Sequence, residues 1–189
     1  MKIQTANQLR GRAIGAIFFT CFGTGWLFLG LAAKQIINAA TAPGTVAGML
    51  IFLLTAAYLL RRARLWPRVA DDPARGRAFA WINAIQWTAI FIVAFSFAKF
   101  HMDAYTTSAI TAIVGLHLFP LARVFRYPLH YLTGAVLVVW AAASAVLLPV
   151  AEMQGTTALG TGAILWASAA VTLGLALAGA RRLPVEMAC

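Results

Sequence analysis

Five polar side chains lie inside long apolar stretches of this chain, where hydrogen-bonding groups are uncommon. Thr55, Asn83 and His117 each lie six residues from an arginine at the end of their stretch, and Thr133 lies seven residues from one. At a helical rise of about 1.5 Å per residue, these side chains would share a depth of roughly 9–10 Å below a layer of arginines. Gln86 follows Asn83 by three residues and would lie on the same helix face, one turn deeper. Polar groups at such a depth tend to face the interior of a bundle, so this layer could bind a small solute.

These polar side chains belong to a sequence with six long apolar stretches. Each is close to the ~20 residues that an α-helix needs to cross the hydrocarbon core of a bilayer. Hydrophobic residues make up 62% of the chain and the mean hydropathy is +0.83, far above the values of soluble domains. We therefore predict an all-α integral membrane protein, in which residues 1–189 form a single six-helix transmembrane bundle. The predicted helices are 13–33, 43–60, 73–98, 104–122, 129–150 and 157–180.

The 15 Lys and Arg residues are distributed unevenly around these stretches. All but Lys34 and Lys99 lie at the two termini or in the second and fourth connections between the stretches. Because each stretch crosses the membrane once, both termini and these two connections lie on the same side of it. Basic residues mark the cytoplasmic side, so we predict that both termini are cytoplasmic and that the membrane is a bacterial-type inner membrane. The net charge of +10 follows from this topology, and we expect no nucleic-acid partner.

The connection at 61–77 is the most polar segment and carries six arginines. Each charge near an anionic membrane surface contributes up to about 1 kcal/mol, so the segment could bind lipid headgroups. The arginines predicted to do so are Arg61, Arg62, Arg64 and Arg68. The alternative is that they only fix the topology. Asp71 and Asp72 before Pro73 are typical of a helix start, and they predict that the third helix begins near Pro73.

His117 has a second distinctive feature, which is its position three residues before Pro120. Proline has no N–H to donate to the carbonyl of Leu116, so a kink or a free acceptor is expected beside the imidazole. His117 could make a hydrogen bond between helices, bind a solute or ion, or ligate a metal or haem. Haem would need a second axial ligand, and His130, the one candidate at comparable depth, lies a turn or more nearer the cytoplasm. We therefore predict no cofactor and no metal site.

The acidic residues argue against several kinds of chemistry, because all five fall outside the predicted helices. A carboxylate-based proton relay inside the membrane is therefore not expected. The sequence also contains no recognisable paired carboxylates, nucleophile–histidine set, metal-binding cluster or phosphate-binding loop. An enzymatic function is not favoured.

Small residues and a repeated pattern suggest how the helices are arranged. Glycines in the first helix and the stripe Ala163, Ala167, Ala170, Gly174 and Ala178 in the sixth would allow close helix packing, within the chain or in a homo-oligomer. Packing within the chain is the simpler interpretation. The segments 37–41, 102–106 and 153–157 align without gaps, each ending in Thr. They indicate either three repeated hairpins or convergent helix-capping residues.

Three hairpins with basic ends in 189 residues resemble the HdeD type of small bacterial inner-membrane protein. The resemblance covers the architecture of the whole chain and rests on no specific motif. Proteins of this type tend to have a proline in each outer turn, and only Pro43 matches that pattern here. The resemblance implies a role in envelope stress or acid tolerance.

The function that these observations favour is the binding or passage of a small, neutral or weakly basic solute through the bundle. The alternative is an accessory membrane protein that acts through lipid or protein contacts. A membrane-embedded enzyme is a third hypothesis.

Overall fold

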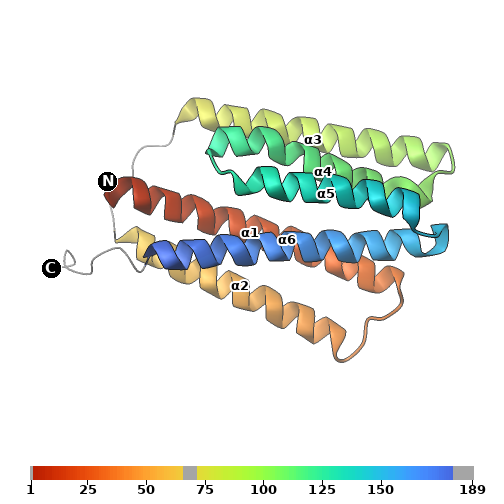
Figure 1. The fold of residues 1–189 in the computed structure, drawn as a ribbon, viewed down its shortest axis with the longest axis horizontal. Coiled ribbons are helices and arrows are strands. Elements are labelled where there is room, and N and C mark those ends of the chain that lie inside the picture. The colour runs from red at the N-terminus through yellow and green to blue at the C-terminus, as the bar shows by residue number, and fades with distance from the viewer. Residues whose placement is uncertain (1, 66–71, 181–189) are drawn as a thin grey trace.

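The chain folds into six helices, which Figure 1 shows running side by side in alternating directions. The computed structural model describes residues 2–65 and 72–180, with side chains from residue 7 onward, and contains no strand within these ranges. Every helix is long and apolar enough to cross a membrane, so the prediction of a six-helix transmembrane bundle is confirmed. The helices are α1 (Lys2–Ala33), α2 (Thr41–Arg64), α3 (Pro73–Lys99), α4 (Asp103–Phe125), α5 (Leu129–Leu147) and α6 (Val150–Ala180).

The first and last helices are longer than their apolar stretches. α1 extends towards the N-terminus beyond residue 13, and α6 begins directly after Pro149. The segment 153–157 therefore lies inside α6, whereas 37–41 and 102–106 lie at the starts of α2 and α4. The three aligned segments thus do not share a local structure.

α3 begins where the sequence predicted. The Asp72 carboxylate accepts a hydrogen bond from the backbone N–H of Ala74 at 2.9 Å, and Pro73 occupies the first turn. Proline suits this position because the first backbone N–H groups of a helix have no partner within it.

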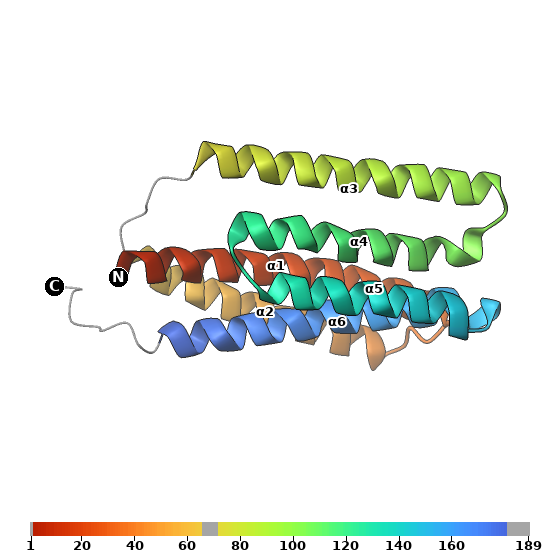
Figure 2. The ribbon, with the colours of Figure 1, turned by 45° about the horizontal axis from the view of Figure 1, so that its top comes forward.

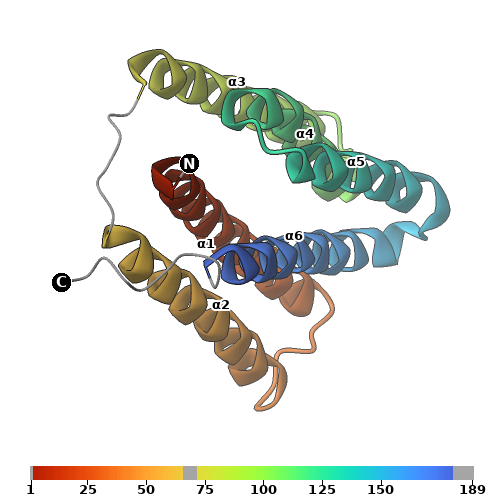
Figure 3. The ribbon, with the colours of Figure 1, turned by 60° about the vertical axis from the view of Figure 1, so that its left-hand side comes forward.

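The helices form two groups that meet at α6. Figure 3 shows α1, α2 and α6 on one side and α3, α4 and α5 on the other. α6 packs extensively along α1 and also contacts α2, α4 and α5. Among the described residues, α3 contacts no helix except α4, and none of its side chains is buried.

Glycines bring the helix backbones together within each group. A Cβ atom built on Gly162 of α6 would lie 2.8 Å from the carbonyl oxygen of Gly23 on α1. One built on Gly134 of α5 would lie 2.7 Å from the carbonyl oxygen of Gly115 on α4. In a membrane such close approach substitutes dispersion contacts for the hydrophobic effect.

The small-residue stripe of α6 does not take part in this packing. Ala163, Ala167, Ala170, Gly174 and Ala178 are all exposed. The simpler interpretation, that this stripe packs inside the chain, is therefore wrong. The buried face of α6 instead carries Thr161, Gly162, Leu165, Ala169 and Leu173.

The alternation of the helices gathers the arginine-bearing ends at one end of the bundle. Figures 1 and 2 show the start of α1, the end of α2, the start of α3 and the α4–α5 turn at this end. The sequence-based pattern of basic connections thus corresponds to one physical end of the molecule, which we call the basic end.

Candidate functional site

Two histidines are enclosed in the half of the bundle near the basic end. Both ring nitrogens of His117, on α4, have almost no accessible surface and no hydrogen-bond partner among the described residues. His130, at the start of α5, is 9% exposed, and within the described chain its Nδ1 atom also lacks a partner. A buried polar atom without a partner is costly, so these nitrogens are candidates for contact with a ligand.

The α4–α5 hairpin positions both imidazoles. Gly115 and Gly134 allow the two backbones to touch, which fixes His117 and His130 on neighbouring helices. Pro120 lies within α4, and the helix continues through it to Phe125. Since proline has no N–H, the carbonyl of Leu116 loses its usual helical donor one residue from His117.

His130 is held by aromatic rings. The rings of Phe19 on α1 and Tyr127 in the α4–α5 turn contact its imidazole edge to face, with centroids 5.4 and 5.0 Å away. The Tyr127 hydroxyl donates to Thr172 Oγ1 of α6 at 3.2 Å, and the guanidinium of Arg12 lies 5.6 Å from the Tyr127 ring centroid. These contacts join α1, α5 and α6 at the basic end.

The predicted site residues on α3 face towards His117's helix. Because α3 contacts α4 alone among the described helices, its partly buried side chains mark the side that faces α4. Asn83 and Gln86 both belong to this side. The Asn83 amide donates to the carbonyl of Phe79 in its own helix at 2.8 Å.

Thr55 and Thr133 lie elsewhere in the bundle. Thr55 is on α2, which within the described chain contacts α1 and α6 but neither α3 nor α4, and its hydroxyl donates to the carbonyl of Ile51 at 2.7 Å. Thr133 is buried between α5 and α6, where its Oγ1 lies 2.8 Å from Ser168 Oγ. The structure therefore brings Asn83 and Gln86 to the helix of His117, but it does not bring all five predicted residues together.

A set of paired hydroxyl groups between α4, α5 and α6 was missed by the sequence reasoning. Ser108 Oγ lies 3.1 Å from Ser144 Oγ, and Thr111 Oγ1 lies 2.9 Å from Thr161 Oγ1. The available signal was the spacing of Thr157, Thr161, Ser168 and Thr172 along one face of α6. These hydroxyls satisfy one another, so the α4–α5–α6 contact is a hydrogen-bonded helix interface.

The arginines predicted to bind lipid headgroups lie at the end of α2. Arg61 and Arg64 are exposed and Arg62 is half-buried, while Arg68 lies outside the described residues. Within the described chain, no group of three or more His, Cys, Asp or Glu side chains could hold a metal ion.

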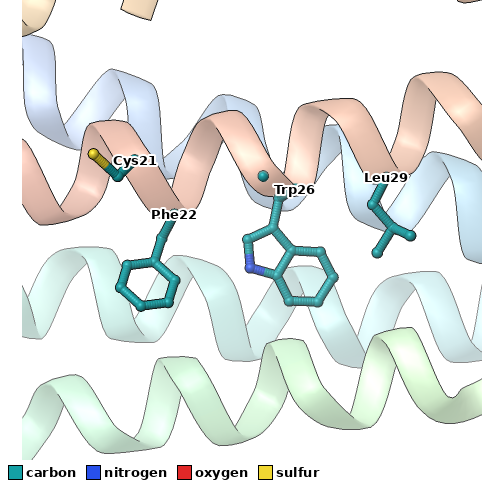
Figure 4. Close-up of a pocket in the computed structure, with 5 residues that line it drawn as sticks. Cys21, Phe22, Trp26 and Leu29 are labelled. Atoms are coloured by element: carbon teal, nitrogen blue, oxygen red, sulfur yellow. The ribbon is translucent and has the colours of Figure 1, made fainter.

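A shallow apolar groove of about 360 Å³ lies on the surface of α1. Figure 4 shows the residues that line it, which are Cys21, Phe22, Gly25, Trp26 and Leu29. Trp26 packs against an apolar cluster that includes Leu118 of α4 and Leu137 of α5. The groove therefore lies beside the junction of the two helix groups.

Comparisons with protein-family models, with curated proteins and with solved structures gave no significant match. The fold and composition define the class, which is an integral membrane protein with six transmembrane helices.

Proposed function

We propose that this protein binds, and passes, a small uncharged or weakly basic solute in a bacterial-type inner membrane, with His117 as the main recognition residue. The observation that carries the proposal is the burial of both His117 ring nitrogens without a hydrogen-bond partner in the described chain. A neutral imidazole offers one donor and one acceptor, which suits an uncharged hydrogen-bonding solute. All three acidic residues with described structure, Asp72, Asp103 and Glu152, lie at helix ends, so no carboxylate inside the bundle favours a strongly cationic solute.

Asn83 and Gln86 would supply the remaining polar contacts, since they lie on the side of α3 that faces α4. Among the described helices α3 contacts α4 alone, so a small displacement of α3 would open the α3–α4 contact on the side of Asn83 and Gln86. Thr133 is already paired with Ser168, and in the described part of the chain Thr55 lies on a helix that contacts neither α3 nor α4, so we assign neither a direct role.

Native mass spectrometry of the protein released from mild detergent tests this proposal. We expect a stoichiometric adduct that is not a lipid and is lost in His117→Ala. Leu116→Ala is the matched control, because it shortens an exposed neighbour at the same depth of the same helix. An adduct retained by His117→Ala, or lost equally in Leu116→Ala, would contradict the proposal.

Passage would be tested separately, by loading the identified solute into proteoliposomes and comparing flux in wild type and His117→Ala. Binding without flux would leave a solute-binding protein and would exclude transport.

A second candidate function, an accessory protein that acts through contacts within the membrane, is favoured by the peripheral position of α3. Large apolar side chains on this helix are exposed, among them Trp81 at 70%, Phe91 at 67% and Phe95 at 74%. In that case photocrosslinking from residue 91 in native membranes should capture one defined protein, and reversing the charges of Arg61, Arg62 and Arg64 should impair function. Capture of lipid alone, with full function of the charge-reversed variant, would exclude this role.

The proposed orientation places the basic end in the cytoplasm. The support is the clustering of arginine-bearing helix ends at one end of the bundle. A single cysteine at Asn38, in a variant lacking Cys21 and Cys189, should react with a membrane-impermeant thiol reagent added to intact cells. A single cysteine at Gln8 should react only after the cells are opened, and the reverse pattern would overturn the orientation.

A further inference from the structure

The groove on α1 continues along the helix as an open track. Gly15, Phe18, Phe22 and Gly25 follow one another at spacings of three or four residues and therefore lie on one face of α1. Phe18 and Phe22 are about half exposed, and no atom lies within 4 Å of a Cβ built on Gly15 or Gly25. The two glycines are thus depressions on either side of two exposed phenyl rings. A single flexible hydrocarbon chain would fit such a track.

The track begins at a positive charge that is already held in place. Arg12 precedes Gly15 by three residues and therefore lies on the same side of α1, one turn nearer the basic end. Its guanidinium lies 5.6 Å from the ring centroid of Tyr127, which contacts α6 through Thr172. Arg123 and Arg126, at the end of α4, are exposed and lie four residues and one residue before Tyr127 in the sequence. Of the acidic residues that the structure describes, Asp72 alone lies at this end, and its carboxylate caps α3.

The distance between the charge and the groove matches the dimensions of a membrane leaflet. Thirteen residues separate Arg12 from Gly25, which corresponds to roughly 20 Å along a helix. Half of a bilayer of about 40–45 Å, headgroups included, is similar. A lipid with its phosphate at Arg12 would therefore end its acyl chain near Gly25.

We propose that this track is a specific site for one anionic phospholipid of the leaflet at the basic end. The phosphate binds Arg12, with Arg123 and Arg126 providing additional positive charge. One acyl chain lies along Phe18 and Phe22 and ends in the groove at Gly25. The site lies on α1 and does not depend on the proposed solute-binding function. It is also distinct from the arginines at the end of α2, which lie on another helix.

The test uses the intact protein in nanodiscs made of phosphatidylglycerol and phosphatidylethanolamine, followed by release and native mass spectrometry. We expect wild-type protein to retain one phosphatidylglycerol molecule preferentially. Gly25→Leu should fill the groove and reduce this retention at least tenfold. Gly174→Leu is the matched control, because Gly174 is exposed on α6 and no atom lies within 4 Å of a Cβ built there, and it should change retention less than twofold.

The charge is tested separately from the groove. Arg12→Gln should reduce the preference for phosphatidylglycerol over phosphatidylethanolamine about fivefold, as expected for the loss of one charge at the surface. Arg75→Gln, which removes an exposed arginine at the same end of the bundle, should reduce it less than twofold. If Gly25→Leu lowers the melting temperature, Gly15→Leu tests the same track in its place. Retention that is equal in the groove variant and Gly174→Leu would overturn the proposal. A loss of preference that is equal in Arg12→Gln and Arg75→Gln would also overturn it.

Discussion

Replacing Gly134 with alanine tests whether direct backbone contact holds the α4–α5 hairpin together. The new Cβ atom would lie 2.7 Å from the carbonyl oxygen of Gly115, whereas ordinary van der Waals contact begins at 3.4 Å. The two helices would therefore have to move apart by about 0.7 Å, because a backbone carbonyl cannot rotate away as a side chain can. The same displacement would disturb the positions of His117 and His130, which the hairpin carries.

The change in the free energy of unfolding of Gly134→Ala combines a cost of close packing with a gain in helix propensity. Adding a methyl group to a closely packed contact costs typically about 1–3 kcal/mol. Alanine is favoured over glycine in a helix interior by about 1 kcal/mol, which is the expected gain at a position with free space. Gly174→Ala provides that control, since no atom lies within 4 Å of a Cβ built on this residue. Both variants gain this preference, so the difference between them is the packing cost, and we expect Gly134→Ala to be less stable than Gly174→Ala by about 1–3 kcal/mol.

The measurement is the free energy of unfolding in mixed micelles, followed by circular dichroism as the denaturing detergent is increased. The double variant Gly115→Ala with Gly134→Ala should cost less than the two single changes together, because the first change already separates the helices. Equal stability of Gly134→Ala and Gly174→Ala would refute the assignment of α4 and α5 as helices in backbone contact.

Three further predictions concern the polar contacts between helices. A double-mutant cycle with Thr133→Val and Ser168→Ala should give a coupling of about 0.6 kcal/mol and at most ~1.7, since the two hydroxyl oxygens lie 2.8 Å apart; no coupling would mean that they do not bond in a membrane. Trp166→Phe should lower the free energy of unfolding by about 0.5–1.5 kcal/mol, because the indole N–H donates to the Thr20 carbonyl and Thr24 Oγ1 at 3.3 and 3.2 Å. The same change at the exposed Trp87 of α3 should have an effect within ~0.5 kcal/mol, and equal effects at both positions would contradict this assignment. Glu152→Gln breaks the ion pair with Lys34 and should cost less than about 1 kcal/mol in low salt and nothing measurable in 1 M salt, and a salt-independent loss would point to packing instead.

The number of helices could be predicted because a bilayer leaves the chain few alternatives. Backbone groups inside hydrocarbon must be paired within the segment, so an apolar stretch of about 20 residues forms a helix. The start of α3 was also predictable, since Asp72 and Pro73 act locally. The starts of α1 and α6 were not predictable, because a helix can begin before its apolar stretch where no residue stops it.

The neighbours of each helix could not be predicted from hydropathy. Counting residues from the arginines gives the depth of a side chain but neither the rotation of its helix nor the helices beside it. Asn83 and Gln86 lie three residues apart in one helix and therefore share a face, so this part of the prediction depends only on local geometry. Thr55 has a similar predicted depth, but the contacts of α2 with α1 and α6 separate it from α3 and α4.

The chemistry of the side chains explains why only part of the predicted polar layer enters the proposed site. Threonine in a helix can donate to the carbonyl four residues earlier, as Thr55 and Thr133 do, and therefore needs no ligand in hydrocarbon. The Asn83 amide is also bonded within its own helix, although it keeps further hydrogen-bonding capacity. His117 has no such bond from either ring nitrogen within the described chain. Of the five residues, His117 is therefore the one whose side-chain polar atoms are buried without a partner in the described chain, and it is where a search for a ligand should begin.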